Sequence, residues 1–188
     1  VRKHFEDPES CPTGMQFFIN RQEIANGREG SQWLPGSESM DLESYVGGLS
    51  HRIEQKEFGF FVNDFQAHSQ SAWIKTRAFF YNLFRRAGIP PVPIVLILFV
   101  SLYSQSPFGV HKDSADVFSL VVRGQKRMRV WPFQAMFHHA RGRIVSPREC
   151  YNLDLFDYSR ELEQSLLLVG DVGDVLYWPS SYWHIAEG

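Results

Sequence analysis

The chain has 188 residues, of which 44% are hydrophobic and 15% aromatic, a length and composition that allow one globular domain with a buried core and exclude a disordered tail. Its 19 Lys and Arg residues nearly balance 21 Asp and Glu residues, which excludes a global field that favours nucleic acid or an anionic membrane. We therefore expect no nucleic-acid partner and no membrane association.

The first part of the chain has an irregular composition and one helical pattern. Residues 1–37 are rich in Gly, Pro, Ser and charged residues and show no clean period, so we expect loops with at most a short helix. From residue 40 to 57 the apolar residues follow a helical spacing, with Ser39 or Asp41 as the N-cap. The stretch "FGFFVNDF" that follows predicts a strand.

A second helix is predicted over residues 71–87, where aromatic and apolar residues gather on one face. Gly88 and the prolines that follow it end this helix. Its aromatic face is compatible with a homodimer interface as well as with packing in a core.

After this helix the sequence changes to short runs of Val, Ile, Leu and aromatic residues separated by Gly, Pro and Asp turns, which predict strands. The predicted strands cover residues 94–101, 117–122, 127–131, 165–169 and 174–178. Helices followed by a group of strands favour an antiparallel barrel or jelly roll over a doubly wound sheet. We therefore expect a helical and irregular cover with one strand over residues 1–90, and a β core over residues 91–188.

The stretch "GVHKDSADVF" carries the first sign of metal chemistry, because His111 and Asp113 are separated by one residue before an apolar strand. With seven histidines and 21 acidic residues, about 0.8 such pairs are expected by chance, so the pair alone is weak. A second pair of this kind, His4 and Glu6, stands in the irregular N-terminal region.

A second histidine strengthens the prediction. In "GDVLYWPSSYWH" a short apolar strand and a Pro-Ser-Ser turn precede His184, which places this histidine on a late strand that can face the early pair. Two imidazoles and one carboxylate on one face of a metal form the facial triad of non-haem iron(II) oxygenases, which leaves three coordination positions open.

A cation is also predicted near this cluster. After Asp113 the sequence predicts an alternating strand, a turn at Arg123 and Gly124, and a returning strand that begins near Lys126. Such a hairpin would bring the ammonium group towards the metal, where it can pair with the distal carboxylate of a dicarboxylic acid.

These residues resemble the JmjC-type branch of the cupin superfamily, the 2-oxoglutarate-dependent iron(II) oxygenases that include asparaginyl and ribosomal-protein hydroxylases. The resemblance covers roughly residues 94–184 and includes the "RGQKRMRVWP" and "GDVLYWPSSYWH" segments. It implies a double-stranded β-helix in which His111, Asp113 and His184 bind iron(II). In the family a Lys or Arg at the position of Lys126 binds the C5 carboxylate of 2-oxoglutarate.

The chain departs from the family pattern in two places. Some members carry a threonine just before the first ligand histidine that assists cosubstrate binding, whereas this chain has Phe108; Ser106, Tyr103 and Ser119 are the candidates for that role. The family also continues into a further barrel strand after the second histidine, so we expect residues beyond Gly188, or a partner that supplies the strand.

The resemblance implies an oxygenase that uses O2 and 2-oxoglutarate to hydroxylate an amino-acid side chain in a protein or peptide, or a small amino-acid-like metabolite, and releases succinate and CO2. Two alternatives stay open. One is a JmjC-like binding module that keeps the fold and the metal without turnover, and the other is a cupin whose metal chemistry does not use 2-oxoglutarate.

The remaining features concern the compartment and the surface. Cys11 and Cys150 form neither a CxxC pair nor a dense framework, which indicates a reduced, cytoplasmic protein. No signal peptide is visible, and the longest apolar run is too short to cross a bilayer. His51, His138 and His139 are expected at the surface or at helix caps.

Overall fold

The computed structural model describes residues 14–24, 33, 41–54, 56–91, 93–140, 146, 149–153 and 156–188. The chain divides into two compact units, Val1–Leu102 and Tyr103–Gly188. Strand β4 (Leu98–Leu102) belongs to the first unit because it pairs along its whole length with β3 (Phe58–Val62).

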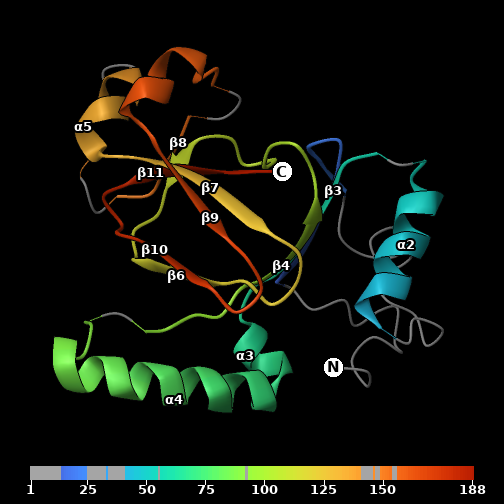
Figure 1. Cartoon of the computed structure of the whole chain (residues 1–188), viewed down its shortest axis with the longest axis horizontal. Coiled ribbons are helices and arrows are strands. Elements are labelled where there is room, and N and C mark those ends of the chain that lie inside the picture. Colours follow the sequence, from blue (N-terminus) through green and yellow to red (C-terminus); the bar gives the residue numbers. More distant parts are fainter. Residues whose placement is uncertain are drawn as a thin grey trace. The chain divides into compact units, whose positions relative to one another are not determined.

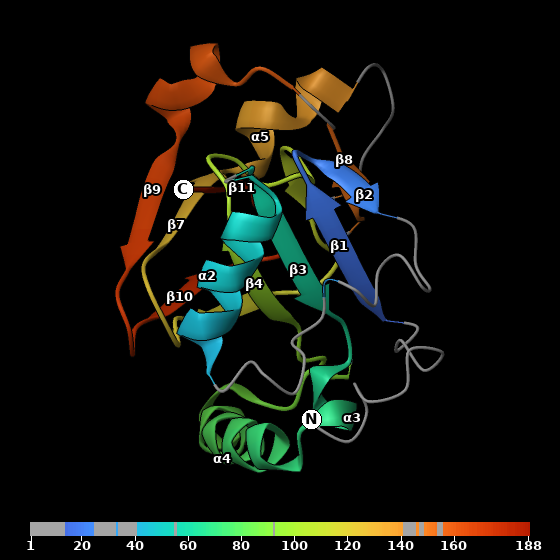
Figure 2. The ribbon, with the colours of Figure 1, turned by 90° about the vertical axis from the view of Figure 1, so that its right-hand side faces the viewer.

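The first unit contains an antiparallel sheet with the strand order β2-β1-β3-β4, whose strands run side by side in Figure 2. β1 (Met15–Ile19) and β2 (Gln22–Ile24) form a hairpin, so the expectation of loops or a short helix is wrong here. Asn20 and Arg21 both have positive φ, 48° and 65°, as a tight turn that follows the twist of a hairpin requires. Because arginine is unusual at such a position, the sequence did not indicate a turn here.

The first predicted helix is confirmed as α2 (Leu42–Arg52). Of the two candidate caps, Asp41 is the N-cap: its carboxylate accepts a hydrogen bond from the Ser44 backbone N–H at 2.8 Å, which satisfies one of the free N–H groups of the first turn. Tyr45, Leu49 and Ile53 of this segment pack against Phe58 of β3, so α2 lies against the sheet of the first unit.

The second predicted helix is confirmed as α4 (Gln70–Ala87), which follows the short helix α3 (Phe65–His68). It ends at Gly88, whose φ of 88° favours glycine at the C-cap. The rings of Phe80 and Phe84 stack at 5.3 Å, but no residue of α4 is fully buried. The prediction of a homodimer through this helix is not tested by the fold.

The second unit is mainly β, which confirms the coarse fold class (Figure 1). Antiparallel strands form a sheet of order β8-β5-β11-β7-β9 and a second sheet of order β10-β6. The strands are β5 (His111–Lys112), β6 (Val117–Leu120), β7 (Lys126–Trp131), β8 (Tyr151–Asn152), β9 (Leu166–Gly170), β10 (Val175–Trp178) and β11 (Trp183–Glu187).

The predicted hairpin between β6 and β7 is wrong. β6 pairs with β10, with Val117 opposite Trp178, whereas β7 pairs with β11 and β9. The turn at Gly124, whose φ is 67°, therefore carries the chain from one sheet to the other. Such a crossing is typical of jelly-roll connections, in which strands adjacent in sequence belong to different sheets.

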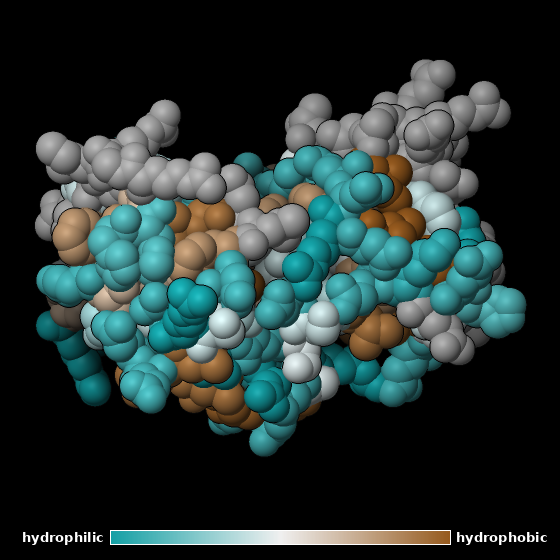
Figure 3. All heavy atoms as spheres, turned by 90° about the horizontal axis from the view of Figure 1, so that it is seen from above, coloured by the Kyte–Doolittle hydropathy of each residue, from teal (hydrophilic) through white to brown (hydrophobic). Residues whose placement is uncertain are grey.

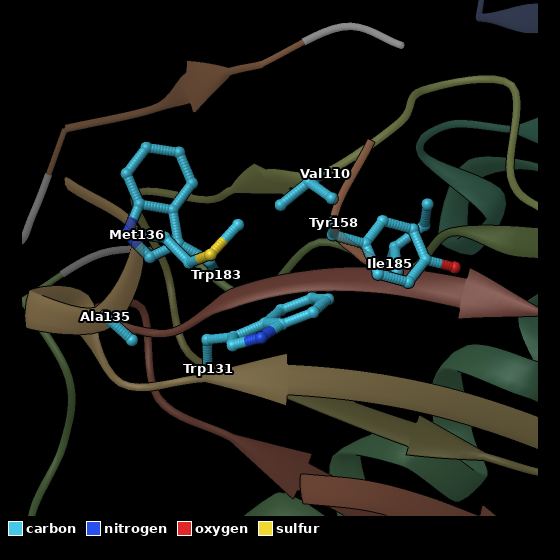
Figure 4. Packing of buried hydrophobic residues seen from close by; sticks show 7 residues of the cluster. All are labelled: Val110, Trp131, Ala135, Met136, Tyr158, Trp183 and Ile185. Carbon is cyan, nitrogen blue, oxygen red and sulfur yellow. The ribbon is translucent and has the colours of Figure 1, made fainter. Parts of the chain in front are cut away.

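The five-stranded sheet has a buried cluster on each face. One cluster contains Met128, Val130 and Ala186 with Trp178 of β10, so it lies between the two sheets. The other is covered by α5 (Phe133–Met136) and by Tyr158, which precedes the 3-10 helix η3 (Ser159–Gln164). Figure 4 shows this second cluster, which contains Val110, Trp131, Ala135, Met136, Tyr158, Trp183 and Ile185.

The view in Figure 3 shows mostly hydrophilic residues with separate apolar patches. Several large apolar side chains on the second unit are exposed, namely Leu120, Val122, Leu166, Val169, Val172, Val175 and Tyr177. Among the described residues, no helix has both the length and the apolar character that a membrane crossing requires. Cys150 is an exposed free thiol, and Cys11 lies outside the described residues.

Candidate metal centre

The structure brings His111, Asp113 and His184 together. His111 lies on β5 and His184 on β11, and the two residues are directly opposite in the antiparallel register. Side chains opposite each other project from the same face of a sheet, so both imidazoles point the same way. Asp113 follows β5 directly, and the alternation of the strand returns it to the face of His111. His4 and Glu6 lie outside the described residues.

The three side chains are close enough to share one ion. Their ligand atoms all lie within 4.8 Å of one another, and His184 Nε2 lies 3.4 Å from Asp113 Oδ2. The ring centroids of His111 and His184 are 4.3 Å apart. Two ligands at about 2.1 Å from one metal ion are separated by about 3.0 to 3.5 Å, so only small side-chain rotations are needed for coordination.

Backbone carbonyls orient both imidazoles. His111 Nδ1 lies 3.0 Å from the Gly109 carbonyl oxygen, and His184 Nδ1 lies 3.3 Å from that of Tyr182. Because a carbonyl only accepts hydrogen bonds, each Nδ1 donates, and each Nε2 keeps a lone pair for a metal. This is the usual arrangement of metal-binding histidines.

The electrostatics of the site favour a neutral His111 and an ionised Asp113. Burial, together with the nearby His184, lowers the pKa of His111 to about 4. Burial raises the pKa of Asp113, but the neighbouring His184, His111 and Lys112 outweigh burial and lower this pKa overall. Metal ligands must be deprotonated, so at neutral pH the His111 and Asp113 ligands are already in the form that binds an ion.

The lowered pKa of His111 predicts an acid sensitivity of the metal-free fold. In the unfolded chain His111 is protonated below its ordinary pKa of 6.5, whereas in the folded chain it is protonated only below about pH 4. The free energy of unfolding therefore falls as the pH is lowered from 6.5 to about 4. Relative to neutral pH, this group is expected to remove about 2 kcal/mol of unfolding free energy at pH 5, measured by urea denaturation. The variant His111→Gln is expected to show a shallower loss, and an identical loss would contradict the assignment.

The opposite face of β5 has a structural role. Lys112 is only 1% exposed and points away from the two histidines, towards the cluster that α5 covers, where its ammonium group donates to the Glu149 carbonyl and lies 5.9 Å from the Phe133 ring centroid. Burial lowers its pKa. The strand therefore separates a histidine that is available for a metal from a lysine that is used in packing.

Lys126 lies on the same face of the five-stranded sheet as the histidines. His184 is opposite Val130 in the register of β11 and β7, and Lys126 follows the same alternation on β7 as Met128 and Val130. Burial lowers the pKa of Lys126 to about 8, and the Lys126 charge contributes to lowering the pKa of His111. The ammonium group thus acts electrostatically on the site, although the β6–β7 hairpin that predicted its position does not exist.

The three candidates for the second cosubstrate contact lie in different environments. Ser119, on β6, is half-buried and shares the face of Val117, which packs between the sheets. Tyr103 packs against the same inter-sheet cluster. Ser106 is buried, and its hydroxyl oxygen accepts a hydrogen bond from the Phe108 N–H at 3.3 Å, which already occupies one of its lone pairs.

Sequence reasoning missed the groups that fix the site. Asp116 accepts hydrogen bonds from the Ser180 N–H at 2.9 Å and the Tyr177 hydroxyl at 3.2 Å, which ties the turn before β11 to the start of β6. The Trp178 ring lies 5.1 Å from the His184 ring. The sequence carried no signal for these contacts because the partners of Asp116, and the ring that lies beside His184, are brought together only by the fold.

The donor set fits a divalent transition metal such as iron(II). Two oriented imidazoles and one carboxylate suit this class of ion and form a face that leaves further positions open. The side chain of His184 is 4% exposed and that of Asp113 is 43% exposed, so the site is closed behind His184 and open beside Asp113. This arrangement suits an ion that is bound from one side, with access for exogenous ligands on the other.

The fold and the cluster thus define a mainly β protein with a candidate metal centre formed by a His-x-Asp pair and a second, distant histidine. The JmjC domain family model matches residues 93–188, just over half of the chain, and the chain belongs to this family within the cupin superfamily. All three candidate ligands and Lys126 lie inside the matched segment. No curated protein matches the chain.

Proposed function

We propose that the chain is an iron(II)- and 2-oxoglutarate-dependent oxygenase that hydroxylates an amino-acid side chain in a protein or peptide, or a small amino-acid-like metabolite. The observation that carries the proposal is the convergence of His111, Asp113 and His184 on the face of a β-sheet that also carries Lys126. JmjC domains are typically oxygenases of this kind. The two antiparallel sheets that enclose this face support a double-stranded β-helix.

In this proposal His111, Asp113 and His184 bind iron(II). When bound, iron(II) and 2-oxoglutarate would supply the oxidising chemistry, in which one oxygen atom of O2 converts a substrate C–H bond to C–OH and the other enters succinate as 2-oxoglutarate loses CO2. The protein keeps both imidazoles in the correct tautomer through the Gly109 and Tyr182 carbonyls. Preorganised ligands avoid a cost of reorganisation when the ion binds.

Lys126 holds the distal carboxylate of 2-oxoglutarate. It lies four positions from Val130, the partner of His184, so about 13 Å of strand separates Lys126 from the metal end. The lysine side chain spans part of this separation, and a five-carbon dicarboxylate held at the metal end would span the rest. The apolar surroundings formed by Met128 and Val130 strengthen the ion pair because they exclude water.

The substrate enters beside Asp113. The side chain of Asp113 and the residues Ser114, Ala115 and Asp116 that follow it are exposed, whereas His184 is covered by Trp178. An opening at the surface accommodates a side chain presented by a protein or peptide as well as a small amino-acid-like molecule. The near-neutral charge of the chain gives no electrostatic support for nucleic acid as substrate.

An anaerobic titration of the iron(II)-loaded protein with 2-oxoglutarate tests the proposal. The expected result is a weak visible charge-transfer band that saturates at one equivalent of 2-oxoglutarate. Readmission of O2 with candidate peptides is then expected to produce succinate in amounts equal to hydroxylated product. A protein that binds iron(II) without this band supports a cupin that does not use 2-oxoglutarate, and a band without succinate from any substrate supports a non-catalytic binding module.

A further inference from the structure

A second cluster of metal-binding side chains lies outside the proposed iron site. His138, His139 and Glu161 bring one ligand atom each to within 4.8 Å of one another. The two histidines belong to the 3-10 helix η2 (Phe137–Ala140), and Glu161 belongs to η3. Nothing in the proposed oxygenase reaction uses these residues.

The side chains of this cluster contact one another, whereas the sequence predicted separate histidines at the surface. His139 Nε2 lies 3.0 Å from Glu161 Oε1, and these side chains are only 23% and 13% exposed. The ring of His138 lies against that of His139, with centroids 3.9 Å apart. The expectation of surface histidines is therefore confirmed for His138, which is exposed, but His139 is partly buried.

The surroundings hold Glu161 in place without an ion. Its carbonyl oxygen accepts a hydrogen bond from the indole N–H of the fully buried Trp131 at 2.8 Å. Its second carboxylate oxygen accepts one from the Gln164 amide at 3.2 Å, which leaves Oε1 directed at His139. Outer-shell hydrogen bonds of this kind orient carboxylate ligands in metal sites.

The histidine side is also fixed. The ring of His139 packs against Phe156 with centroids 4.3 Å apart, and η2 continues directly from α5, whose Met136 is fully buried. A hydrogen bond between His139 and Glu161 needs only these two residues. The adjacent His138 ring supplies a third donor, and the combination of two imidazoles and one carboxylate is a common set for zinc.

We propose that His138, His139 and Glu161 bind a divalent transition metal ion of the zinc class, with water completing the coordination. The ion links η2 to η3, the segments on either side of residues 141–158. It therefore stabilises the cover of the buried cluster that contains Trp131, and it is independent of iron at His111. A direct consequence is that the protein binds two metal equivalents, one at each site.

The test uses Co²⁺, whose visible spectrum reports coordination, on the whole chain with the first site disabled by Asp113→Ala. We expect this variant to keep one Co²⁺ equivalent with a visible d–d band and to gain thermal stability on adding Zn²⁺. Adding either His139→Ala or Glu161→Gln is expected to weaken Co²⁺ binding by at least about 100-fold. The matched control adds His51→Ala, an exposed histidine of α2, and is expected to change nothing.

The outcome is independent of the oxygenase proposal because the first site is already disabled. Glu161→Gln keeps the size of the side chain, and far-UV circular dichroism shows whether each variant is folded. If the Asp113→Ala variant binds no Co²⁺, or if folded Glu161→Gln and His139→Ala variants bind it as tightly as the parent, the cluster is only a hydrogen-bonded pair beside an exposed histidine and the proposal is wrong.

Discussion

Replacement of His184 by alanine is expected to abolish iron(II) binding at the first site, with a loss of affinity of at least about 100-fold. His184 is 3% exposed and supplies an Nε2 that the Tyr182 carbonyl keeps free for a metal. Two remaining ligands on one side of an ion cannot retain it against water. Anaerobic equilibrium dialysis with iron(II) measures the effect as the loss of one bound equivalent.

Two variants separate this loss from a folding defect. His184 packs beside Trp178, so the alanine variant leaves a cavity, whereas Asp113 is half-exposed and its replacement by alanine disturbs little packing. Both variants are expected to lose the same equivalent. The exposed His51 on α2 provides the matched control. Retention of full iron(II) affinity in folded His184→Ala and Asp113→Ala variants would show that the cluster is not the metal site.

Replacement of Lys126 by alanine is expected to weaken 2-oxoglutarate binding by about 10- to 150-fold, because a charge-assisted pair is worth about 1.5 to 3 kcal/mol and the carboxylate would be left without a partner. The charge-transfer band of the anaerobic titration measures the affinity. Iron(II) binding is expected to stay unchanged, since Lys126 supplies no metal ligand. Lys126→Arg is expected to restore part of the affinity, and Lys75→Ala, an exposed residue of α4, is the neutral control.

The same pair predicts a pH dependence of cosubstrate binding. Burial lowers the pKa of Lys126 to about 8, so the ammonium form that attracts a carboxylate is present below this value and disappears above it. Affinity for 2-oxoglutarate is therefore expected to fall as pH rises above about 8, and Lys126→Arg is expected to flatten this fall because arginine stays charged. Equal pH profiles in the two proteins would remove Lys126 from the cosubstrate site.

Elements with strong local signals were predicted correctly. The helix expected over residues 71–87 is α4 (Gln70–Ala87), because helical periodicity and a glycine C-cap are properties of adjacent residues. The strands β6, β7, β9 and β10 lie close to the predicted ranges for the same reason. The β1–β2 hairpin was not predicted because Asn20 and Arg21 both adopt positive φ in its turn, a conformation that the pair Asn-Arg does not indicate.

Strand partners were not predictable in the same way. The sequence paired β6 with β7 because they are neighbours in the chain, whereas each finds its partner in a distant strand. The two-residue strand β5 exists only through its pairing with β11 and β8. Pairing over long sequence separations depends on which apolar faces can be buried together, and this is decided by the whole sheet and not by a local pattern.

The sequence by itself determined the chemical inventory of the proposed site, namely His111, Asp113, His184 and Lys126, because residue type and spacing are local properties. Only the tertiary structure decided that the two histidines face each other and that Asp116 ties the turn before β11 to β6. The contact between Glu161 and His139 was likewise visible only in the tertiary structure. These contacts link residues far apart in the chain, and they form where burial of the two apolar clusters brings separate strands and turns together.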